Sequence, residues 1–310
     1  MPRAEGRALA IVNPASGGGR TLRRWPTIRA ELQRHLGRFD EASTEYRGHA
    51  TAIARSALSD GYRLIVAIGG DGTLSEVANG FFTHGQPHAQ VAALGHIPQG
   101  TGCDFGRTLG LESDWRRACA RFAGGELRTI DVGHVEFVGH EGESSERVFV
   151  NVASFGCGGA VSGAVQHSGK RIAGRLAFTL TTFRTLMTYR DQPVSVSFDG
   201  DAAAAMNVTN LAVCNARYFG GGMRVAPTAQ IDDGQLDITI WAGFGLRDFI
   251  LKYRKLFDGS HVEDPRTLSR RARHLRATSD TRVLLDVDGE NPGRLPATFS
   301  VIPSALRLWT

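Results

Sequence analysis

The sequence predicts two domains of different class: an N-terminal α/β domain with a parallel sheet, and a C-terminal domain that is mainly an antiparallel β-sandwich. The chain has 310 residues, which is enough for two ordinary domains. Over residues 1–128, short apolar runs alternate with segments of helical spacing. Over residues 129–310, strand-like runs bounded by Gly, Asp and Pro predominate, and the last of these residues can return to the first domain.

Four apolar runs of the N-terminal domain are expected to be strands, each followed by a helix. The expected strands are residues 8–14, 40–46, 63–70 and 90–98, and the expected helices are 20–37, 49–61, 73–82 and 114–125. Apolar strands that alternate with helices are typical of a parallel sheet covered on both faces.

The C-terminal domain is expected to contain seven strand-like runs and two helices. The runs are residues 130–138, 146–156, 193–200, 206–216, 235–243, 282–289 and 297–303, and the helices are 174–190 and 246–257. Short strands separated by turn residues are typical of an antiparallel sandwich or barrel.

Composition excludes several classes of protein. Hydrophobic residues make up 42% of the chain and charged residues 22%, as in soluble globular proteins. The net charge of +5 suits phosphorylated ligands or anionic lipid, and without a lysine run we expect no nucleic-acid partner. The four cysteines form no CxxC pair, which argues against zinc or disulfides and favours a reducing cytosol. With neither a signal peptide nor a spanning apolar stretch, a cytoplasmic protein is expected, able to sit peripherally at the inner face of the membrane.

Three glycine-bearing turns, at residues 13–20, 69–73 and 98–107, each follow an expected parallel strand. The carboxyl ends of such strands open on one edge of the sheet, where ligands bind. Glycine lets the backbone approach an oxygen-rich ligand, helix N-termini offer N–H groups to anions, and Ser16, Thr73 and Thr101 add hydroxyls. The turns predict a phosphate site, although each alone could be a simple strand–helix turn. No Walker A or GxGxxG motif is present.

Two acidic turns mark the second domain. One contains Asp232, Asp233 and Asp237, and the other contains Asp286, Asp288 and Glu290. Asp-Gly pairs are common in hairpin turns, so a structural role stays open. Asp288 and Glu290 would share one face of a strand, where carboxylates can accept a proton or share a metal ion.

In this order, the motifs NPASGGGR, GGDGTLSEVANG, PQGTGCDFGR, GGGMRVAPTAQIDDGQLDI and DVDGE resemble the diacylglycerol kinase catalytic domain family. This family includes soluble bacterial lipid kinases and is related to sphingosine and ceramide kinases. The resemblance implies an NAD kinase/diacylglycerol kinase-like fold and a lipid-binding second domain. It also implies ATP and Mg²⁺ as cofactors, with ATP between the domains, and a lipid alcohol as acceptor.

The resemblance also implies site residues. Those expected to hold the nucleotide are Asn13, Pro14, Ser16, Gly17, Thr44, Gly69, Gly70, Asp71, Gly72, Thr73, Glu76 and Thr101. Asp288 or Glu290 would be the general base. Asp71, with Asp104, would form a network toward the catalytic magnesium. A structural Mg²⁺ would be held by the Asp233 side chain and the backbone carbonyls of Gln230 and Gln235.

Two features depart from a simple kinase pattern. Cys103 stands where the family usually has Asn, and a thiol cannot replace an amide's donor and acceptor. A P-loop lysine is missing, which makes Arg20 or Arg107 a candidate for contacting the transferred phosphate.

Two basic stretches, residues 167–190 and 265–277, could dock on anionic lipid. They could equally be an ordinary packed helix and a solvated charged face, respectively.

The motifs and the family that they resemble therefore imply an ATP-dependent lipid kinase. The alternatives are a kinase of a soluble acceptor such as NAD and a catalytically weak nucleotide-binding regulator. The lipid is not predicted, and the oligomeric state stays open, with a homodimer as one option.

Overall fold

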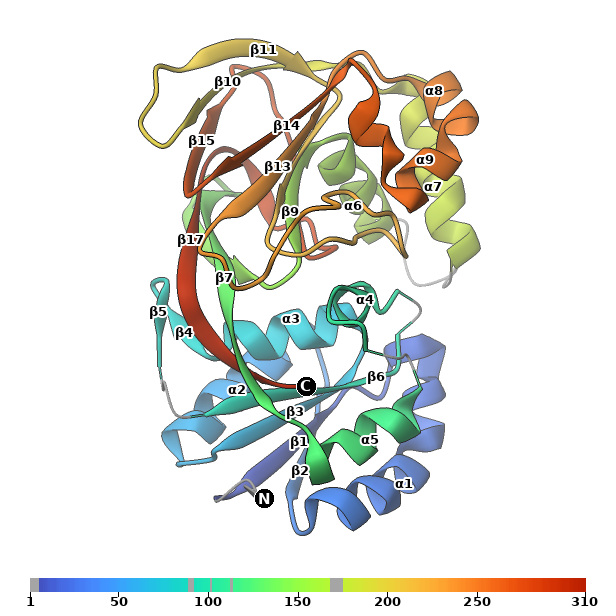
Figure 1. Ribbon diagram of the computed structural model, residues 1–310, viewed down its shortest axis with the longest axis vertical. Coiled ribbons are helices and arrows are strands. Elements are labelled where there is room, and N and C mark those ends of the chain that lie inside the picture. Colours follow the sequence, from blue (N-terminus) through green and yellow to red (C-terminus); the bar gives the residue numbers. More distant parts are fainter. Residues whose placement is uncertain (1–5, 89–91, 101, 112–113, 168–174) are drawn as a thin grey trace. The chain divides into compact units, whose positions relative to one another are not determined.

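The computed structural model describes residues 6–88, 92–100, 102–111, 114–167 and 175–310. The chain divides into two compact units, Met1–Val132 with Ser304–Thr310, and Gly133–Pro303. Strand β7 (Leu127–Gly139) leads from the first unit into the second, and β17 (Gly293–Trp309) leads back (Figure 1). The sequence-based division into residues 1–128 and 129–310 stays a prediction. Among the described residues, no helix is long and apolar enough to cross a membrane.

The first unit contains a parallel sheet in the order β6-β3-β1-β2, with the end of β17 parallel to β6. Its strands are β1 (Ala8–Val12), β2 (Asp40–Ser43), β3 (Leu64–Gly69) and β6 (Ala93–Pro98), and a small hairpin pairs β4 (Phe82–Thr83) with β5 (Gln86–Pro87). Every residue of β1, β3 and β6 is buried. This burial accounts for their continuous apolar sequences.

Helices accompany this sheet in the described part of the unit (Figure 1). They are α1 (Ser16–Leu36), α2 (His49–Ser59), α3 (Asp71–Asn79), α4 (Asp104–Thr108) and α5 (Trp115–Gly124). Helices α1 and α5 pack together over alternate strand residues such as Val66 and Ile68, while α2 packs on α3. The parallel α/β prediction for this part of the chain is confirmed.

Within its described residues, the second unit has antiparallel strands that belong to two sheets. One has the order β11-β10-β15-β17, with β7 pairing β8 and β17, and the other has the order β14-β13-β12-β9-β16. Besides β7 and β17, the strands of these sheets are β8 (Ser144–Phe149), β9 (Val152–Gly156), β10 (Gln192–Phe198), β11 (Ala204–Val208), β12 (Asn210–Cys214), β13 (Leu236–Trp241), β14 (Thr267–Ala272), β15 (His274–Thr278) and β16 (Leu285–Val287). The sandwich prediction is therefore also confirmed.

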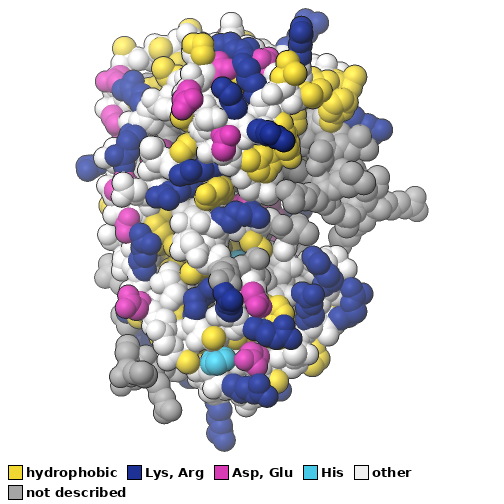
Figure 2. All heavy atoms as spheres, turned by 45° about the vertical axis from the view of Figure 1, so that its right-hand side comes forward, with side chains coloured by type: hydrophobic (Ala, Val, Ile, Leu, Met, Phe, Trp, Pro, Cys, Tyr) yellow, Lys and Arg dark blue, Asp and Glu magenta, His cyan; other side chains and the backbone are white. Residues whose placement is uncertain are grey.

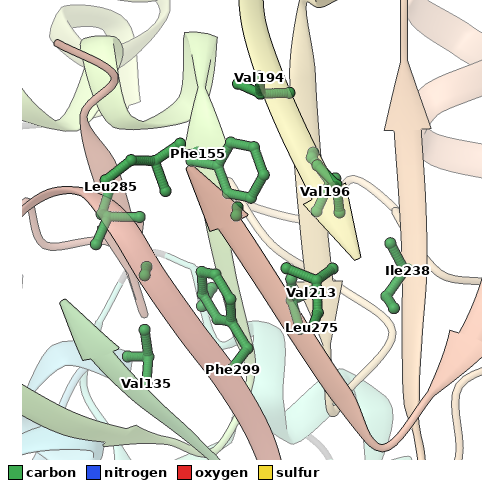
Figure 3. Packing of buried hydrophobic residues seen from close by; sticks show 14 of the residues in the cluster. Val135, Phe155, Val194, Val196, Val213, Ile238, Leu275, Leu285 and Phe299 are labelled. Carbon is green, nitrogen blue, oxygen red and sulfur yellow. The ribbon is translucent and has the colours of Figure 1, made fainter. Parts of the chain in front are cut away.

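A hydrophobic core built from both sheets holds the second unit together (Figure 3). Every second residue of a strand points into it, as Val194 and Val196 do from β10. The rings of Phe155 and Phe299 stack with their centroids 6.1 Å apart. Truncating either ring to Ala would cost about 3–5 kcal/mol of unfolding free energy.

The helices of the second unit differ in part from the prediction. They are α6 (Cys157–His167), α7 (Arg175–Thr188), α8 (Leu246–Leu251), α9 (Tyr253–Asp258) and a 3₁₀ turn (Ser260–Glu263). Helix α6 was not predicted, because its Gly-, Ala- and Ser-rich sequence lacks a clear apolar stripe. The single helix expected at 246–257 is broken at Lys252, where φ is −106° and ψ is 11°. The basic stretch 265–277 forms strands β14 and β15.

Candidate active site

The first glycine loop begins where β1 ends, and Asn13 organises it. The Asn13 side-chain oxygen accepts a hydrogen bond from the Ala15 N–H at 3.1 Å, and its amide nitrogen donates to Thr73 Oγ1 at 2.9 Å. Gly17, Gly18 and Gly19 follow with φ values of 61°, 68° and 82°. Three successive left-handed residues are readily adopted only by glycine. Asn13 thus ties the first loop to the second, directly before this run.

The second loop ends β3 and begins α3. Gly70 is extended, and the helix starts at Asp71, so Asp71 lies in its first turn. A Cβ at Gly69 would collide with Thr73 Oγ1, because the Thr73 side chain packs directly on the Gly69 backbone. N–H groups of a first helical turn have no partner within the helix and attract anions. This loop therefore offers an anion-binding helix start.

The third loop approaches the other two backbone to backbone. A Cβ at Gly100 would lie 2.6 Å from Gly70 Cα, and a Cβ at Gly17 would lie 2.6 Å from the Gln99 carbonyl oxygen. Ser16 Oγ lies 3.6 Å from the position of a Cβ on Gly70. The structure therefore brings the three glycine loops into contact within the first unit. Side chains larger than hydrogen at Gly17 and Gly100 would force them apart.

Asp71 is linked to the third loop as well. Its carboxylate accepts hydrogen bonds from the backbone N–H of Asp104 at 3.2 Å and of Phe105 at 3.4 Å. The Asp104 carboxylate in turn forms an ion pair with Arg107 at 2.7 Å. Arg107 therefore has a carboxylate partner, while Arg20 Nε donates to the Gly17 carbonyl oxygen at 2.9 Å. The resemblance implied one network for Asp71 and Asp104, and the structure links the Asp71 carboxylate to the Asp104 backbone.

The remaining nucleotide candidates have different surroundings. Thr44 is buried beside the end of β1, where its N–H donates to the Val12 carbonyl at 2.9 Å. Glu76 Oε2 accepts a hydrogen bond from the Ala50 N–H at 3.2 Å, so this carboxylate lies at the start of α2. Pro14 lies in the turn between Asn13 and Ser16. Thr101 lies outside the described residues.

In the second unit, Asp288 and Gly289 form the two-residue turn of a hairpin. Their φ values are 49° and 87°, and Val287 and Glu290 exchange backbone hydrogen bonds of 2.8 and 3.0 Å across the turn. Positive φ at both central residues is the geometry of a type I′ turn, for which Asp-Gly is favoured. The hairpin interpretation of this motif is therefore correct. The expectation that Asp288 and Glu290 share one face of a strand is wrong, because Asp288 lies in the turn after β16.

These two carboxylates have different partners. The Asp288 carboxylate accepts three backbone hydrogen bonds of 3.1 Å, from the N–H groups of Val150, Asn151 and Val152. Glu290 instead forms an ion pair with Arg147 at 2.8 Å. Asp288 therefore holds the turn against the start of β9, whereas the ion-pair partner of Glu290 is a long side chain that can change rotamer.

A third carboxylate, Asp286, lies buried beneath this turn. It accepts a hydrogen bond from the Ser162 hydroxyl of α6. Burial raises the pKa of the Asp286 carboxyl to about 7, against the opposing effect of the Ser162 hydrogen bond. The negative charges of Asp288 and Glu290 also act to raise this pKa. Asp286, the middle residue of β16, consequently titrates near neutral pH.

Replacing Asp286 with Asn should flatten the pH dependence of stability. Between the ordinary pKa near 3.8 and the folded value near 7, the folded state keeps a proton that the unfolded state releases. Unfolding free energy of the wild type should therefore fall by about 2–3 kcal/mol from pH 5 to pH 8 relative to Asp286→Asn. Urea unfolding of both proteins at the two pH values measures this. An equal difference at both pH values would contradict it.

Comparisons with known proteins agree over nearly the whole chain. Residues 7–135 match the diacylglycerol kinase catalytic domain, and residues 151–310 match the YegS C-terminal NAD kinase beta sandwich-like domain. A diacylglycerol kinase of Staphylococcus epidermidis (strain RP62A) is 31% identical, covering 98% of this chain and 92% of its own length. One from Bacillus subtilis (strain 168) is 29% identical, with coverages of 94% and 92%. The chain belongs to the diacylglycerol kinase catalytic domain family.

Solved structures agree with this assignment. The crystal structure of a proposed diacylglycerol kinase from Bacillus anthracis str. Sterne superimposes with a TM-score of 0.78 at 26% identity, covering 98% of this chain and 94% of that one. Yeast NADH kinase has a TM-score of 0.50 at 11% identity, covering 98% of this chain and 82% of that one, and shows a shared fold alone. The diacylglycerol kinase-like fold and the family resemblance inferred from the motifs are both confirmed.

Cys103, the departure from the usual family motif, occupies a strained position. Its φ is 54° and its ψ is 37°, in the left-handed region where Asn is favoured over most residues. The side chain is buried, and burial raises the pKa of its thiol to about 11. The backbone conformation explains why Asn suits this position.

Replacing Cys103 with Asn should raise the unfolding free energy by about 1 kcal/mol, because Asn adopts left-handed backbone at lower cost. Urea unfolding measures the change. Cys103→Ala is the control, since it removes the thiol and keeps the unfavourable conformation. Equal stability of the Asn and Ala variants would show that the backbone is not responsible.

The acidic loop of the second unit already has a cation beside it. Asp233 Oδ1 accepts a hydrogen bond from the Gln235 N–H at 3.1 Å, and Asp233 Oδ2 accepts one from the Arg271 guanidinium of β14. Arg271 also lies 3.6 Å from Asp237. No cluster of three or more His, Cys, Asp or Glu side chains in the described part of the chain is placed to hold a metal ion.

As they stand, these residues do not fit a Mg²⁺ ion, because the ion would have to displace Arg271 from Asp233. The site predicted at Gln230, Asp233 and Gln235 stays a prediction, and no chemical step is derived from it. Arg271 gives the loop its positive charge instead. Sequence reasoning placed Arg271 in the basic stretch 265–277 but did not pair it with Asp233, because the two residues are 38 positions apart.

Arg271→Gln should therefore make stability responsive to Mg²⁺. We expect the wild-type melting temperature to be the same in EDTA and in Mg²⁺. The variant should lose about 1 kcal/mol in EDTA, a value typical of a partly exposed ion pair, and regain stability with Mg²⁺. The matched control is Arg270→Gln: Arg270 lies on the same strand as Arg271, and the change breaks its ion pair with Asp201. Stabilisation of the wild type by Mg²⁺ to the same extent as the variant would contradict this.

Two further residues near the glycine loops were missed by sequence reasoning. Gln99 is buried, and its Oε1 has no hydrogen-bond partner among the described residues. His96 is buried against the Gly69 carbonyl, and burial lowers its pKa. Gln99 lies inside a quoted motif and could have been considered, whereas His96 lies within an apolar strand that gave no signal.

Proposed function

We propose that this protein is an ATP-dependent lipid kinase that transfers the γ-phosphate of ATP to the hydroxyl of a lipid such as diacylglycerol. The observation that carries the proposal is the contact of three glycine loops at the starts of α1 and α3, where Gly17 and Gly100 leave no room for a side chain. Membership of the diacylglycerol kinase family supports the lipid as acceptor.

The glycine loops would bind the phosphates of ATP. Left-handed backbone at Gly17–Gly19 and the first turn of α3 present N–H groups suited to an anion. Ser16 and Thr73 would add hydroxyl contacts. The buried Gln99 Oε1 is a further hydrogen-bond acceptor, and it has no donor among the described residues. When bound, ATP supplies the phosphoryl group, and the Mg²⁺ that accompanies it offsets part of the negative charge.

Asp71 would orient the phosphate end of this site. The N–H groups of Asp104 and Phe105 fix its carboxylate in the first turn of α3. A bare carboxylate would repel phosphate, so Asp71 would act toward the cation that accompanies the nucleotide. The proposal explains why an acidic side chain lies at a helix start otherwise suited to anions.

Glu290 would accept the proton of the lipid hydroxyl. Asp288 has three backbone donors on its carboxylate, which suits a residue that holds the turn. Glu290 has an Arg147 partner that can reorient as the proton arrives. We therefore assign Glu290 as the general base and Asp288 as a positioning residue.

Transfer to two acceptors tests the proposal. Purified protein with ATP and Mg²⁺ is given either diacylglycerol in nonionic micelles or NAD in solution, and phosphorylated products are separated. We expect phosphatidate and no NADP. NADP formation without phosphatidate would support the soluble-acceptor alternative, and neither product from any lipid or NAD would favour a catalytically weak regulator.

A further inference from the structure

Helices α7, α8 and α9 of the second unit expose large apolar side chains. Leu251 is 73% exposed, Met187 62%, Ile250 56%, Tyr253 42% and Phe183 38%. Helix α8 contacts both α7 and α9. In Figure 2, hydrophobic side chains gather toward the upper right of the face shown, next to Lys and Arg side chains. A grouped apolar surface of this kind marks an interaction site more often than scattered single residues do.

Cations border these apolar side chains. Arg247, Ile250 and Leu251 follow the i, i+3, i+4 spacing of α8, which places them on one side of that helix. Arg254 lies in α9, beyond the break at Lys252. Five exposed cations that form no ion pair within the described residues are Arg184, Arg190, Arg247, Arg254 and Lys255.

The acidic residues next to α8 are neutralised on its inner side. Asp248 is paired with Arg266, which holds the pKa of that carboxyl at about 2, and with Lys252 at 3.5 Å. Asp264 is paired with Lys252 as well as Arg266. Leu256 of α9 packs on the core around Trp241. These ion pairs and the packing of Leu256 hold α8 and α9 on the second unit. Their outer face has a positive charge excess.

The second basic stretch suggested by the sequence, residues 265–277, lacks this arrangement. Arg266, Arg270 and Arg271 each form an ion pair with an aspartate of the same unit. Their charges are thus partly offset within the protein. Residues 168–174 of the first stretch lie outside the described residues, whereas Phe183, Arg184, Met187 and Arg190 belong to the surface described above.

We infer that this surface of α7–α9, formed by the five apolar residues and the five cations, docks the protein on an anionic lipid bilayer. The inference rests on the proposed lipid kinase function, since such an enzyme needs access to a substrate held in a membrane. The apolar side chains enter the boundary between headgroups and acyl chains, while the long basic side chains extend to anionic headgroups. Binding of this kind is reversible, and salt weakens it.

Vesicle flotation tests the docking surface. The probe is phosphatidylcholine vesicles with and without phosphatidylglycerol, at low and high salt. We expect wild type to float with the anionic vesicles at low salt only. Ile250→Glu with Leu251→Glu should reduce the bound fraction roughly tenfold or more, and Arg247→Gln or Arg254→Gln should reduce it roughly fivefold each.

Leu268→Glu is the matched control, because Leu268 is 55% exposed on β14, outside this surface. It should float like wild type. Equal flotation of the Ile250/Leu251 variant and wild type would overturn the inference. So would a fall in sedimentation coefficient in that variant without lipid, which would mean that the surface joins two copies of the chain.

A micelle assay separates this inference from the proposed function. Short-chain diacylglycerol in nonionic micelles requires no anionic bilayer, so the docking variants should phosphorylate it at the wild-type rate. Absence of lipid phosphorylation by wild type, with flotation still dependent on Ile250 and Leu251, would reject the kinase proposal and leave the surface supported. Loss of the micelle activity in the docking variants would instead make these residues part of the active site and overturn the inference.

Discussion

Glu290→Gln is expected to lower kcat by roughly 10²- to 10⁴-fold, the usual contribution of a general base. Gln has the same shape and keeps an oxygen that can accept a hydrogen bond from Arg147, so the fold should persist. Initial rates of lipid phosphorylation give kcat, and urea unfolding checks stability. Glu146→Gln is the control, because it removes a neighbouring carboxylate on β8 that pairs with His134.

Asp288→Asn separates the two candidate bases. The amide has one oxygen for three backbone donors and would place its own NH₂ group against an N–H, so we expect a loss of about 2–3 kcal/mol of stability. Its activity should fall together with that stability. A stable, inactive Asp288→Asn beside an active Glu290→Gln would reverse the assignment of the base.

Gly100→Ala is expected to abolish nucleotide binding at millimolar ATP. Its Cβ would lie 2.6 Å from Gly70 Cα, and backbone cannot move away as a flexible side chain can. The second and third loops would have to separate, which displaces the N–H groups at the start of α3. Isothermal titration with ATP and Mg²⁺ should show a loss of affinity of roughly a hundredfold or more, on the scale of misplacing a binding loop.

Gly124→Ala is the control for this prediction. Gly124 lies at the end of α5, and a methyl group added there would meet open space, so Ala should be tolerated and slightly stabilising. Unchanged ATP affinity in Gly100→Ala, in a protein that is folded, would show that the contact between the loops is not needed for the nucleotide.

The fold and the glycine loops could be predicted from the sequence, because both depend on patterns among residues that are close together in the chain. Buried parallel strands require continuous apolar runs, as in β3, and the loops that end them require glycine where backbones touch. The turn at Asp288 and Gly289 is local too. From the sequence these glycines indicate a close approach of the backbone to a ligand, and the structure shows that Gly70 and Gly100 also approach each other.

The features that sequence reasoning missed depend on contacts between distant segments. Arg147 reaches Glu290 across 143 positions, and Ser162 reaches Asp286 across 124. Helix α6 is built from small residues that carry no periodic signal. The apolar surface of α7–α9 was hidden for a different reason: only burial distinguishes Leu256, which packs inward, from Leu251, which is exposed.

The most direct test of the central claim is to incubate the protein with γ-labelled ATP, Mg²⁺ and a bacterial lipid extract, and to follow the label by mass spectrometry. The account predicts that wild type places the label on the hydroxyl of one lipid class, and that Glu290→Gln leaves the extract almost unlabelled. Label that appears in no lipid with wild type, or that appears equally with both proteins, would contradict it.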